Sequence, residues 1–305
     1  METDTPLSLA DLPNWSFAGT ALTVVGFPIK HSLSPPMHNA ALRAMAVEAP
    51  ELSDWRYFRC ELQADDLCHA LPVFADKGVR GINLTIPHKV EVIRFLNEVD
   101  PVAARMGAVN TLLLEDGRYR GTNTDGYGIA QAVRETLGAE LGSRPVILLG
   151  AGGAARAIAV QCLMDGSPAV WVGNRSADRL HSFLQALGAA FPQAMDRVRT
   201  FPLDSPPHLS EPVWLINATA LGLRSDDPPP FEVAHLPGGS GVYDTTYGVE
   251  NALARAARAA GVPYADGLSM LVWQGARSLS LWTGREVPAD IMAGAVRKSL
   301  AERAK

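Results

Sequence analysis

The stretch PVILLGAGGAARA, residues 145–157, decides the fold of the second part of the chain. Its continuous aliphatic run predicts a strand buried on both faces, and an apolar helix to about residue 163 follows. Between them stand Gly150-Ala151-Gly152-Gly153-Ala154-Ala155, which match the pattern G-x-G-x-x-G/A in its strand–turn–helix setting. The first glycine makes the turn, the second lets the backbone approach a pyrophosphate, and Ala155 allows close helix–strand packing. The stretch therefore predicts a dinucleotide-binding turn.

The residues after the next expected strand, 169–173, indicate which dinucleotide binds. An NAD site places Asp or Glu there to contact the adenosine ribose. This chain instead has Asn174-Arg175-Ser176, with Arg179 one helical turn later. A guanidinium favours a 2′-phosphate, so the pattern predicts NADP (as NADPH in the reductive direction). The alternative is that Arg175 is an ordinary surface arginine.

A second polar stretch, Asn83-Leu84-Thr85-Ile86-Pro87-His88-Lys89, lies in the first part of the chain. Asn83 and Thr85 share one face of a strand because strand side chains alternate, and Pro87 ends the strand. Lys89 follows where the chain turns into a helical pattern. Such groups suit a pocket at the carboxyl edge of an α/β sheet. The alternative is a solvated lysine at the start of a surface helix.

Residues 26–35 predict a loop that enters a helix. Ser34 is expected to be the N-cap and Pro35 the first helical residue. Ser32 and His31 have no such local role, and beside a helix N-terminus they would suit a small anion or a polyol.

Two further polar residues stand out from their surroundings. Asp125 lies in the small and polar run Gly121–Gly126 at the start of a helix, where it is either an N-cap or part of a second polar cluster. Gln274 is a single amide in an apolar helix over residues 268–282, so it is either buried with partners or faces a pocket.

Composition narrows the class of protein. A chain of 305 residues favours two domains, and 47% hydrophobic with 19% charged residues is ordinary for a globular enzyme. A net charge of −5 gives no electrostatic reason to bind nucleic acid or an anionic membrane. Three cysteines without metal-ligand spacing, an acidic N-terminus and no long apolar run predict a cytoplasmic protein that holds no metal. Residues 1–19 are expected to be a loosely packed extension.

The alternation of strands and helices predicts parallel sheets. Nine motifs follow in order with apt spacing: HSLSP, NLTIPHK, GAVNT, NTDG, GAGGAARA, NRS, NATxLG, YDxxY and GxxMLVxQ. Together they resemble the shikimate dehydrogenase family over nearly the whole chain after residue 20. The resemblance implies an α/β substrate domain with a mainly parallel sheet over residues 1–124, completed by C-terminal helices in 267–305. Residues 125–266 would form an inserted Rossmann NADP-binding domain.

The resemblance also implies an activity, the reversible NADPH-dependent reduction of 3-dehydroshikimate to shikimate, which belongs to aromatic amino acid and chorismate biosynthesis. The substrate carboxylate would be held by Ser32 and Ser34, and its hydroxyls by Asn83, Thr85, Asn110 and Gln274. Lys89 and Asp125 would be the catalytic pair that also contacts substrate, with Tyr247 near the nicotinamide. The cofactor-binding residues implied are Gly150, Ala151, Gly152, Gly153, Ala154, Asn174, Arg175, Ser176, Arg179, Thr219, Gly267 and Met270. The small-molecule substrate would be the main partner of a monomer or homodimer.

The chain departs from the family near Tyr247. Gly248 stands where the family usually has Pro, and Glu250-Asn251 replace a Thr-Pro pair, which predicts a more mobile loop. Two rival functions stay open. One is a quinate/shikimate or aminoshikimate dehydrogenase with broader substrate or NAD use, against which the serine pair leans modestly. The other is a non-catalytic dinucleotide-binding regulator, which would not need both Lys89 and Asp125.

Overall fold

The computed structural model describes residues 5–303, and the chain forms two compact units. The first unit contains the residues up to Ala104, Ala108–Thr124 and the residues from Gln274 onward. The second contains Arg105–Gly107 and Asp125–Trp273. The first unit is therefore built from both ends of the chain.

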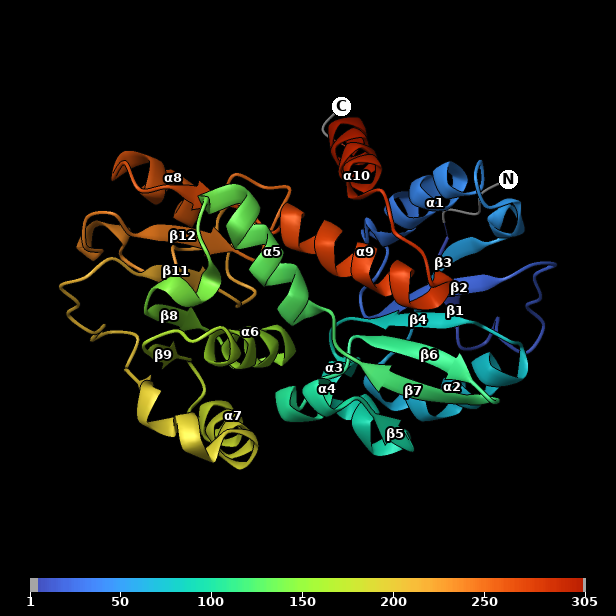
Figure 1. The fold of residues 1–305 in the computed structure, drawn as a ribbon, viewed down its shortest axis with the longest axis horizontal. Helices are drawn as coiled ribbons and strands as arrows, with labels where there is room; N and C mark the ends of the chain where they lie inside the picture. Colours follow the sequence, from blue (N-terminus) through green and yellow to red (C-terminus); the bar gives the residue numbers. More distant parts are fainter. Residues whose placement is uncertain (1–4, 304–305) are drawn as a thin grey trace. The chain divides into compact units, whose positions relative to one another are not determined.

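A mixed sheet forms the centre of the first unit (Figure 1). Its order is β1-β3-β2-β4-β6-β7-β5, and the pairs among β1 to β4 are parallel, whereas β6 is antiparallel to both of its neighbours. The antiparallel pair follows from the tight turn at Asp116-Gly117, where both residues have positive φ. The strands are β1 Leu7–Ser8, β2 Ala21–Gly26, β3 Arg56–Glu61, β4 Gly81–Leu84, β5 Glu98–Val99, β6 Thr111–Glu115 and β7 Arg118–Thr122.

Helices cover both faces of this sheet. Residues of α2 join one face in a core with Val25, Cys60 and Ile82. On the other face α1 packs against β3 and α10, and Trp282 of α9 donates from Nε1 to the carbonyl of Leu112 at 2.9 Å. The helices are α1 Ser34–Met45, α2 Leu67–Asp76, α3 His88–Glu91 and α10 Ala289–Arg303, with short 3-10 turns at Pro50–Leu52, Ala64–Asp66 and Val92–Phe95. A further helix, α4, spans Pro101–Met106.

The expectation of a loose N-terminal extension is wrong for the described residues from 5 onward. Leu7 and Ser8 pair in parallel with Cys60 and Glu61 as the edge strand β1. Leu12 is fully buried, and Trp15 packs edge-on against Phe58 at 5.4 Å between ring centroids. The segment is too short and irregular for periodicity to reveal it, but its apolar side chains complete the core. Residues 1–4 lie outside the described part.

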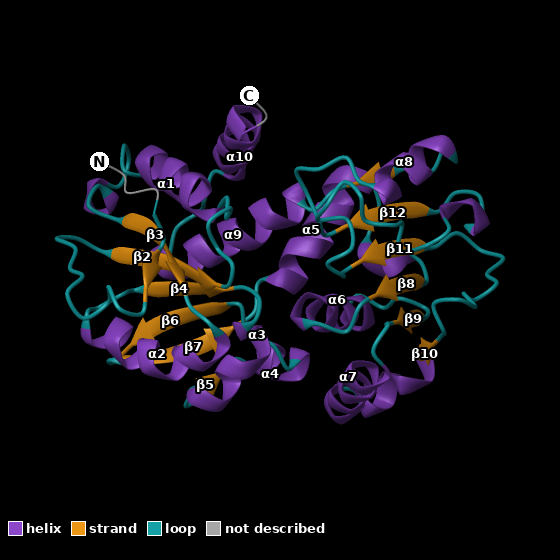
Figure 2. Cartoon of the chain, turned by 180° about the vertical axis from the view of Figure 1, so that it is seen from behind, coloured by secondary structure: helices purple, strands orange, loops and turns teal. Residues whose placement is uncertain are grey.

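The second unit holds a wholly parallel sheet in the order β10-β9-β8-β11-β12-β13 (Figure 2). Counted from β8, this is the order 3-2-1-4-5-6 of the dinucleotide-binding Rossmann fold, as expected from residues 145–157. All four residues of the central β8 are buried. The strands are β8 Val146–Leu149, β9 Val170–Gly173, β10 Val198–Thr200, β11 Trp214–Asn217, β12 Gly241–Asp244 and β13 Tyr264–Ala265.

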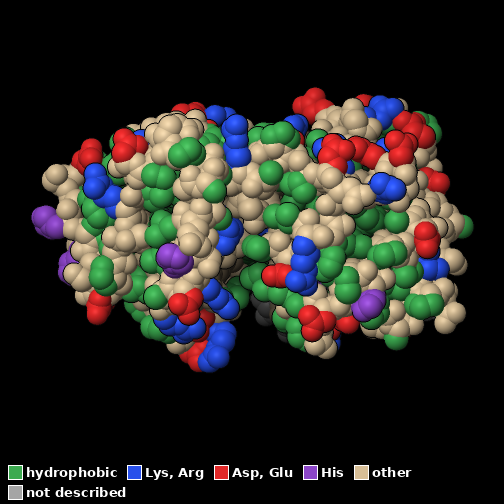
Figure 3. Space-filling view, turned by 90° about the horizontal axis from the view of Figure 1, so that it is seen from below, with side chains coloured by type: hydrophobic (Ala, Val, Ile, Leu, Met, Phe, Trp, Pro, Cys, Tyr) green, Lys and Arg blue, Asp and Glu red, His purple; other side chains and the backbone are tan. Residues whose placement is uncertain are grey.

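Four helices belong wholly to this unit, of which α6 follows β8 directly through the glycine turn. They are α5 Asp125–Leu137, α6 Gly153–Met164, α7 Ala177–Ala190 and α8 Ala252–Ala259, with 3-10 turns at Leu141–Ser143, Pro192–Arg197 and Val233–His235. Within residues 5–303 no helix is long and apolar enough to cross a membrane. On the face drawn in Figure 3, basic and acidic side chains are interspersed.

The expected return of the chain at residue 267 needs correction to residue 274. Helix α9, Leu268–Thr283, is continuous, and its two ends have different partners. In the second unit, the backbone N–H of Met270 donates to Tyr243 Oη at 3.1 Å, and Trp273 Nε1 donates to Glu135 at 2.7 Å. From Gln274 onward the helix belongs to the first unit. Sequence cannot show this boundary, because no breaker interrupts the helix.

Candidate functional site

A buried hydrogen-bond network lies at the centre of the first unit, around Asn83 at the end of β4. The Asn83 amide donates to Thr111 Oγ1 at 3.1 Å and to Ser278 Oγ at 3.0 Å. Its carbonyl oxygen accepts from Tyr57 Oη at 2.8 Å. Because Asn83 is 6% exposed, these bonds fix its orientation at the carboxyl edge of the strand.

The same network contains Asn110 and Gln274, two of the residues expected at the substrate. Asn110 donates from Nδ2 to Thr124 Oγ1 at 3.0 Å and to Gln274 Oε1 at 3.4 Å. Its Oδ1 accepts from the backbone N–H of Thr124 at 2.8 Å. The structure therefore brings Asn83, Asn110 and Gln274 together, although they come from three distant parts of the sequence.

Four members of this network were not expected from sequence: Tyr57, Thr111, Thr124 and Ser278. The Ser278 hydroxyl lies 2.8 Å from Thr111 Oγ1 and 3.1 Å from Thr124 Oγ1. One signal could have found Ser278, because it lies four residues after Gln274 and so shares its helical face. Tyr57 offers no such signal, since an aromatic residue in a buried strand is ordinary core.

The serine pair is arranged differently from the expectation. Ser34 is the first residue of α1, not its N-cap, and it is buried. Ser32 Oγ accepts from the Ser34 backbone N–H at 3.2 Å, so Ser32 does have a local role. The loop before the helix is held from β3, because Arg59 donates to the Lys30 carbonyl at 2.8 Å and Glu61 accepts from Ile29 N–H at 2.8 Å. His31 is exposed.

Lys89 lies at the start of α3, one residue after a fully buried histidine. His88 Nε2 lies 2.9 Å from the Leu62 carbonyl oxygen, and burial lowers the pKa of His88. The Lys89 carbonyl accepts from Val109 N–H at 2.7 Å. Thr85 precedes the helix and donates its N–H to Val25 at 2.9 Å. Lys89 is half-buried and its backbone is fixed on both sides, which suits a positioned ammonium.

The glycine turn of the second unit fits a dinucleotide. Gly150 has φ +114°, and a Cβ there would come within 2.7 Å of the Ala218 carbonyl oxygen, so the position needs glycine. A Cβ at Gly152 would meet nothing within 4 Å, which leaves that side of the backbone open to a ligand. Ala155 is fully buried, as close packing of α6 on the sheet requires. Gly153 and Ala154 open the helix.

The residues expected to contact the adenosine ribose stand together after β9. Asn174 Nδ2 donates to the Ser176 carbonyl at 2.8 Å, and Ser176 Oγ caps α7 by accepting from Arg179 N–H at 3.3 Å. Arg175 and Arg179 are both exposed, so their guanidinium groups are accessible to an anion.

A buried carboxylate organises the loops after β11 and β12. Asp244 is fully buried and accepts from Asn217 Nδ2 at 2.9 Å and from Asn251 Nδ2 at 2.8 Å. Asn217 also accepts from Thr219 Oγ1 at 2.7 Å, which uses that hydroxyl within the loop. Gly267 is tightly placed, because a Cβ there would lie 2.2 Å from the Thr245 carbonyl oxygen. Met270 is buried.

The loop after Tyr247 follows a path that the usual family residues could not. Gly248 has φ +82°, which proline cannot adopt, and Asn251 caps α8 by accepting from Ala254 N–H at 3.0 Å. Asn251 therefore ties the end of this loop to Asp244. Tyr247 is half-buried, and Asp125 is 3% exposed at the start of α5.

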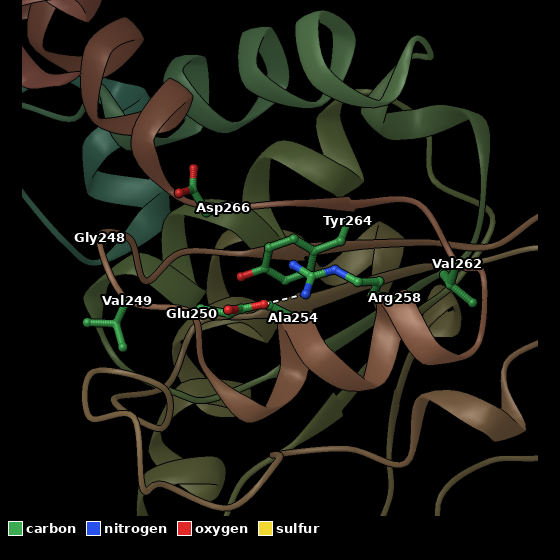
Figure 4. A pocket seen from close by; sticks show the side chains of 8 residues that line it. All are labelled: Gly248, Val249, Glu250, Ala254, Arg258, Val262, Tyr264 and Asp266. Atoms are coloured by element: carbon green, nitrogen blue, oxygen red, sulfur yellow. Dashed lines mark ion pairs between the residues drawn. The ribbon is translucent and has the colours of Figure 1, made fainter. Parts of the chain in front are cut away.

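A pocket of about 540 Å³ lies beside this loop, between it, α8 and β13 (Figure 4). An ion pair joins Glu250 to Arg258 across it, and Tyr264 Oη donates to Asp244 at 3.4 Å. None of the residues expected to bind substrate or cofactor lines it. Among residues 5–303, no group of three or more His, Cys, Asp or Glu side chains could hold a metal ion.

Comparison with known proteins gives a consistent result. A model of the shikimate dehydrogenase substrate binding domain matches residues 24–112, and one of the shikimate 5′-dehydrogenase C-terminal domain matches residues 267–297. The shikimate dehydrogenase (NADP(+)) of Methanothrix thermoacetophila is 41% identical over 278 residues, which is 91% of this chain and 96% of the relative.

Two solved structures are similar over almost their whole length. One is shikimate 5-dehydrogenase from Thermus thermophilus in complex with NADP(H) and shikimate, with TM-score 0.78 and 33% identity over 92% of this chain and 99% of the other. The second is quinate dehydrogenase from Corynebacterium glutamicum in complex with NAD, with TM-score 0.79 and 26% identity over the same shares. Taken with the polar network and the glycine turn, these similarities show that the chain belongs to the shikimate dehydrogenase family.

Proposed function

We propose that this protein is an oxidoreductase that reduces 3-dehydroshikimate reversibly to shikimate with NADPH. The observation that carries the proposal is the joint presence of the Asn83–Asn110–Gln274 network and the Rossmann glycine turn in a family member. The network offers amides and hydroxyls that suit a polyol, and the glycine turn suits a dinucleotide.

The reaction adds a hydride to the substrate ketone carbon and a proton to its oxygen, which becomes a hydroxyl group. The bound nicotinamide supplies the hydride. We assign the proton transfer to Lys89, because an ammonium offers both a proton and positive charge to the developing alkoxide. Asp125 is the proposed second member of the catalytic pair, and Ser32 and Ser34 are proposed to hold the substrate carboxylate.

The cofactor assignment rests on the residues after β9. Arg175 and Arg179 are exposed there, and no Asp or Glu occupies positions 174–176 to accept from a ribose 2′-hydroxyl. We therefore propose NADP rather than NAD. Quinate or aminoshikimate as the preferred substrate is the competing possibility, since a quinate dehydrogenase shares the fold. A monomeric or homodimeric state and a cytoplasmic location stay predictions, the latter supported by the free thiols of Cys60, Cys68 and Cys162.

The experiment follows NADPH formation from shikimate by the wild type and by Lys89→Ala. We expect turnover to fall about 10²–10⁴-fold in the variant, the usual scale for loss of general acid–base catalysis. Shikimate affinity should change less. Arg94→Ala is the control, because Arg94 is an exposed cation a few residues later that pairs with Glu91. A Lys89→Ala enzyme that keeps more than about a tenth of wild-type turnover would remove Lys89 from the mechanism.

A further inference from the structure

Arg156 is a half-buried guanidinium for which sequence predicted no role. It lies in the first turn of α6, directly after the small residue that ends the glycine pattern. Its Nε–H is buried without a hydrogen-bond partner in the described part of the chain. Burial lowers the pKa of Arg156. An unpaired buried donor on a cation is costly, so an acceptor is expected to complete it in some state of the protein.

The surroundings of Arg156 hold the group in place without neutralising it. The guanidinium carbon lies 6.0 Å from the centroid of the Phe183 ring. On another side, a Cβ at Gly107 would lie 3.2 Å from Arg156 Nη1. These contacts restrict the side chain, so little conformational freedom is left to lose when an anion binds.

A pocket of about 180 Å³ places Arg156 beside a second arginine. It is lined by Ala151 of the glycine turn, Arg156, and Asp178, Arg179 and Ser182 of α7. Two guanidinium groups outweigh the single carboxylate of Asp178, and the Ser182 hydroxyl can donate as well. The pocket therefore has the donors and the net positive charge that a phosphate requires.

The position of the pocket selects which phosphate. In a Rossmann fold the pyrophosphate lies at the second glycine and the start of the helix, whereas the adenosine ribose lies towards the end of the neighbouring strand. The pocket lies between the turn after β8 and the first turns of α7, which follows β9. This is the ribose side of the dinucleotide.

Resting on the proposed function, we propose that Arg156, with Arg179, binds the 2′-phosphate of NADP and so contributes to cofactor selection. The buried guanidinium approaches from α6 and the exposed ones from the β9–α7 side. An anion held between them fills the valence that Arg156 lacks. NAD, with a ribose hydroxyl in place of the phosphate, leaves Arg156 unpaired.

The test measures binding of two fragments by calorimetry, adenosine 2′,5′-bisphosphate and adenosine 5′-monophosphate, which differ by the 2′-phosphate alone. Arg156→Gln should weaken the bisphosphate about 10- to 100-fold, the scale of a charge-assisted hydrogen bond, and leave the monophosphate within about 3-fold. Arg199→Gln is the matched control, since Arg199 also lies over an aromatic ring in this unit, at 5.6 Å from the Trp171 centroid, but outside the pocket. It should change neither affinity.

Equal losses for both fragments, or no loss for the bisphosphate, would overturn the proposal. If Arg156→Gln does not fold, Arg156→Lys keeps the charge and must still weaken the bisphosphate more than the monophosphate. Fragment binding needs no turnover, so it can succeed or fail independently of the activity. Wild-type turnover of shikimate with NADP, measured beside it, reports on the proposed function alone.

Discussion

The amide of Asn83 has three hydrogen-bond partners on three different segments, which makes it the most constrained side chain of the first unit's network. Tyr57 Oη donates to it, and Thr111 and Ser278 accept from it. In a buried network each lost partner leaves a polar atom unpaired, at a cost of about 1–3 kcal/mol. The network therefore fixes the direction of the groups at the carboxyl edge of β4.

Gln274 and Ser278 allow the binding and structural roles of this network to be separated. Gln274 is half-buried with one amide contact to Asn110, whereas Ser278 is fully buried among Asn83, Thr111 and Thr124. Gln274→Leu should weaken shikimate by about 1–3 kcal/mol while the melting temperature stays near that of the wild type. Ser278→Ala is the matched variant, with the loss expected in thermal stability.

Calorimetric titration of shikimate beside a melting curve distinguishes these outcomes for both variants. A destabilised Gln274→Leu protein with unchanged shikimate affinity would show that Gln274 is only a core amide. NADP affinity should be unaffected in both.

Individual side chains were predictable from sequence where a motif fixes their chemistry. Gly150 was expected at a tight turn, and its φ of +114° agrees. Ser34 was expected to cap α1, but the chain enters the helix one residue earlier, with Leu33 as the cap. Proline at the next position is compatible with either start, so the local pattern could not decide between them. Tyr57 and Arg156 carry no local signal, because their roles depend on neighbours from other elements.

Helix α1 and strand β3 meet through a stacked pair whose charge state depends on pH. The rings of His38 and Tyr57 are parallel at 4.1 Å between centroids, and both ring nitrogens of His38 are buried without a partner in the described residues. Burial lowers the pKa of His38 from 6.5 to about 3. The unfolded chain therefore binds a proton on this residue at pH values where the folded protein does not.

The sign of the resulting pH dependence follows directly. Above pH 6.5 His38 is neutral in both states and the stability is fully present; it is lost as pH falls from about 6.5 towards 3. At pH 4.5 the loss from this group should be about 2–3 kcal/mol relative to pH 7.5. His88, whose pKa is also lowered by burial, acts in the same direction.

His38→Phe keeps a ring on Tyr57 but cannot take up a proton. Urea unfolding at pH 7.5 and pH 4.5 should show a smaller acid-induced loss of stability in the variant than in the wild type. Equal losses in the two proteins would show that His38 does not titrate on unfolding.

Elements with a long apolar run or a turn signal were predictable, whereas the short edge strands were not. The strand expected at 145–149 is β8, and the hairpin after Asn110 is β6 and β7. Strands β1, β5, β10 and β13 have two or three residues each, too few for an alternation to appear. They exist because neighbouring strands offer unpaired backbone groups, which is a property of the assembled sheet.

At the scale of the whole molecule, the first unit is completed by the far end of the chain. Residues from Gln274 onward supply Ser278 to the network and Trp282 to the face of the sheet beside Gly81, where a Cβ would lie 2.3 Å from the indole. The family resemblance gave this arrangement, and composition or periodicity alone would not have done so. The assignment of substrate to the first unit and cofactor to the second stays a prediction.

The central claim, an NADP-dependent shikimate dehydrogenase, is tested most directly by steady-state kinetics of the wild type with shikimate or quinate and NADP or NAD, in all four pairings. The serine pair and the arginines after β9 predict the highest kcat/KM for shikimate with NADP. A 2′-phosphate that contributes one charge-assisted hydrogen bond should favour NADP over NAD by about 10-fold or more. Higher kcat/KM for quinate with NAD, or no turnover in any pairing, would contradict the account.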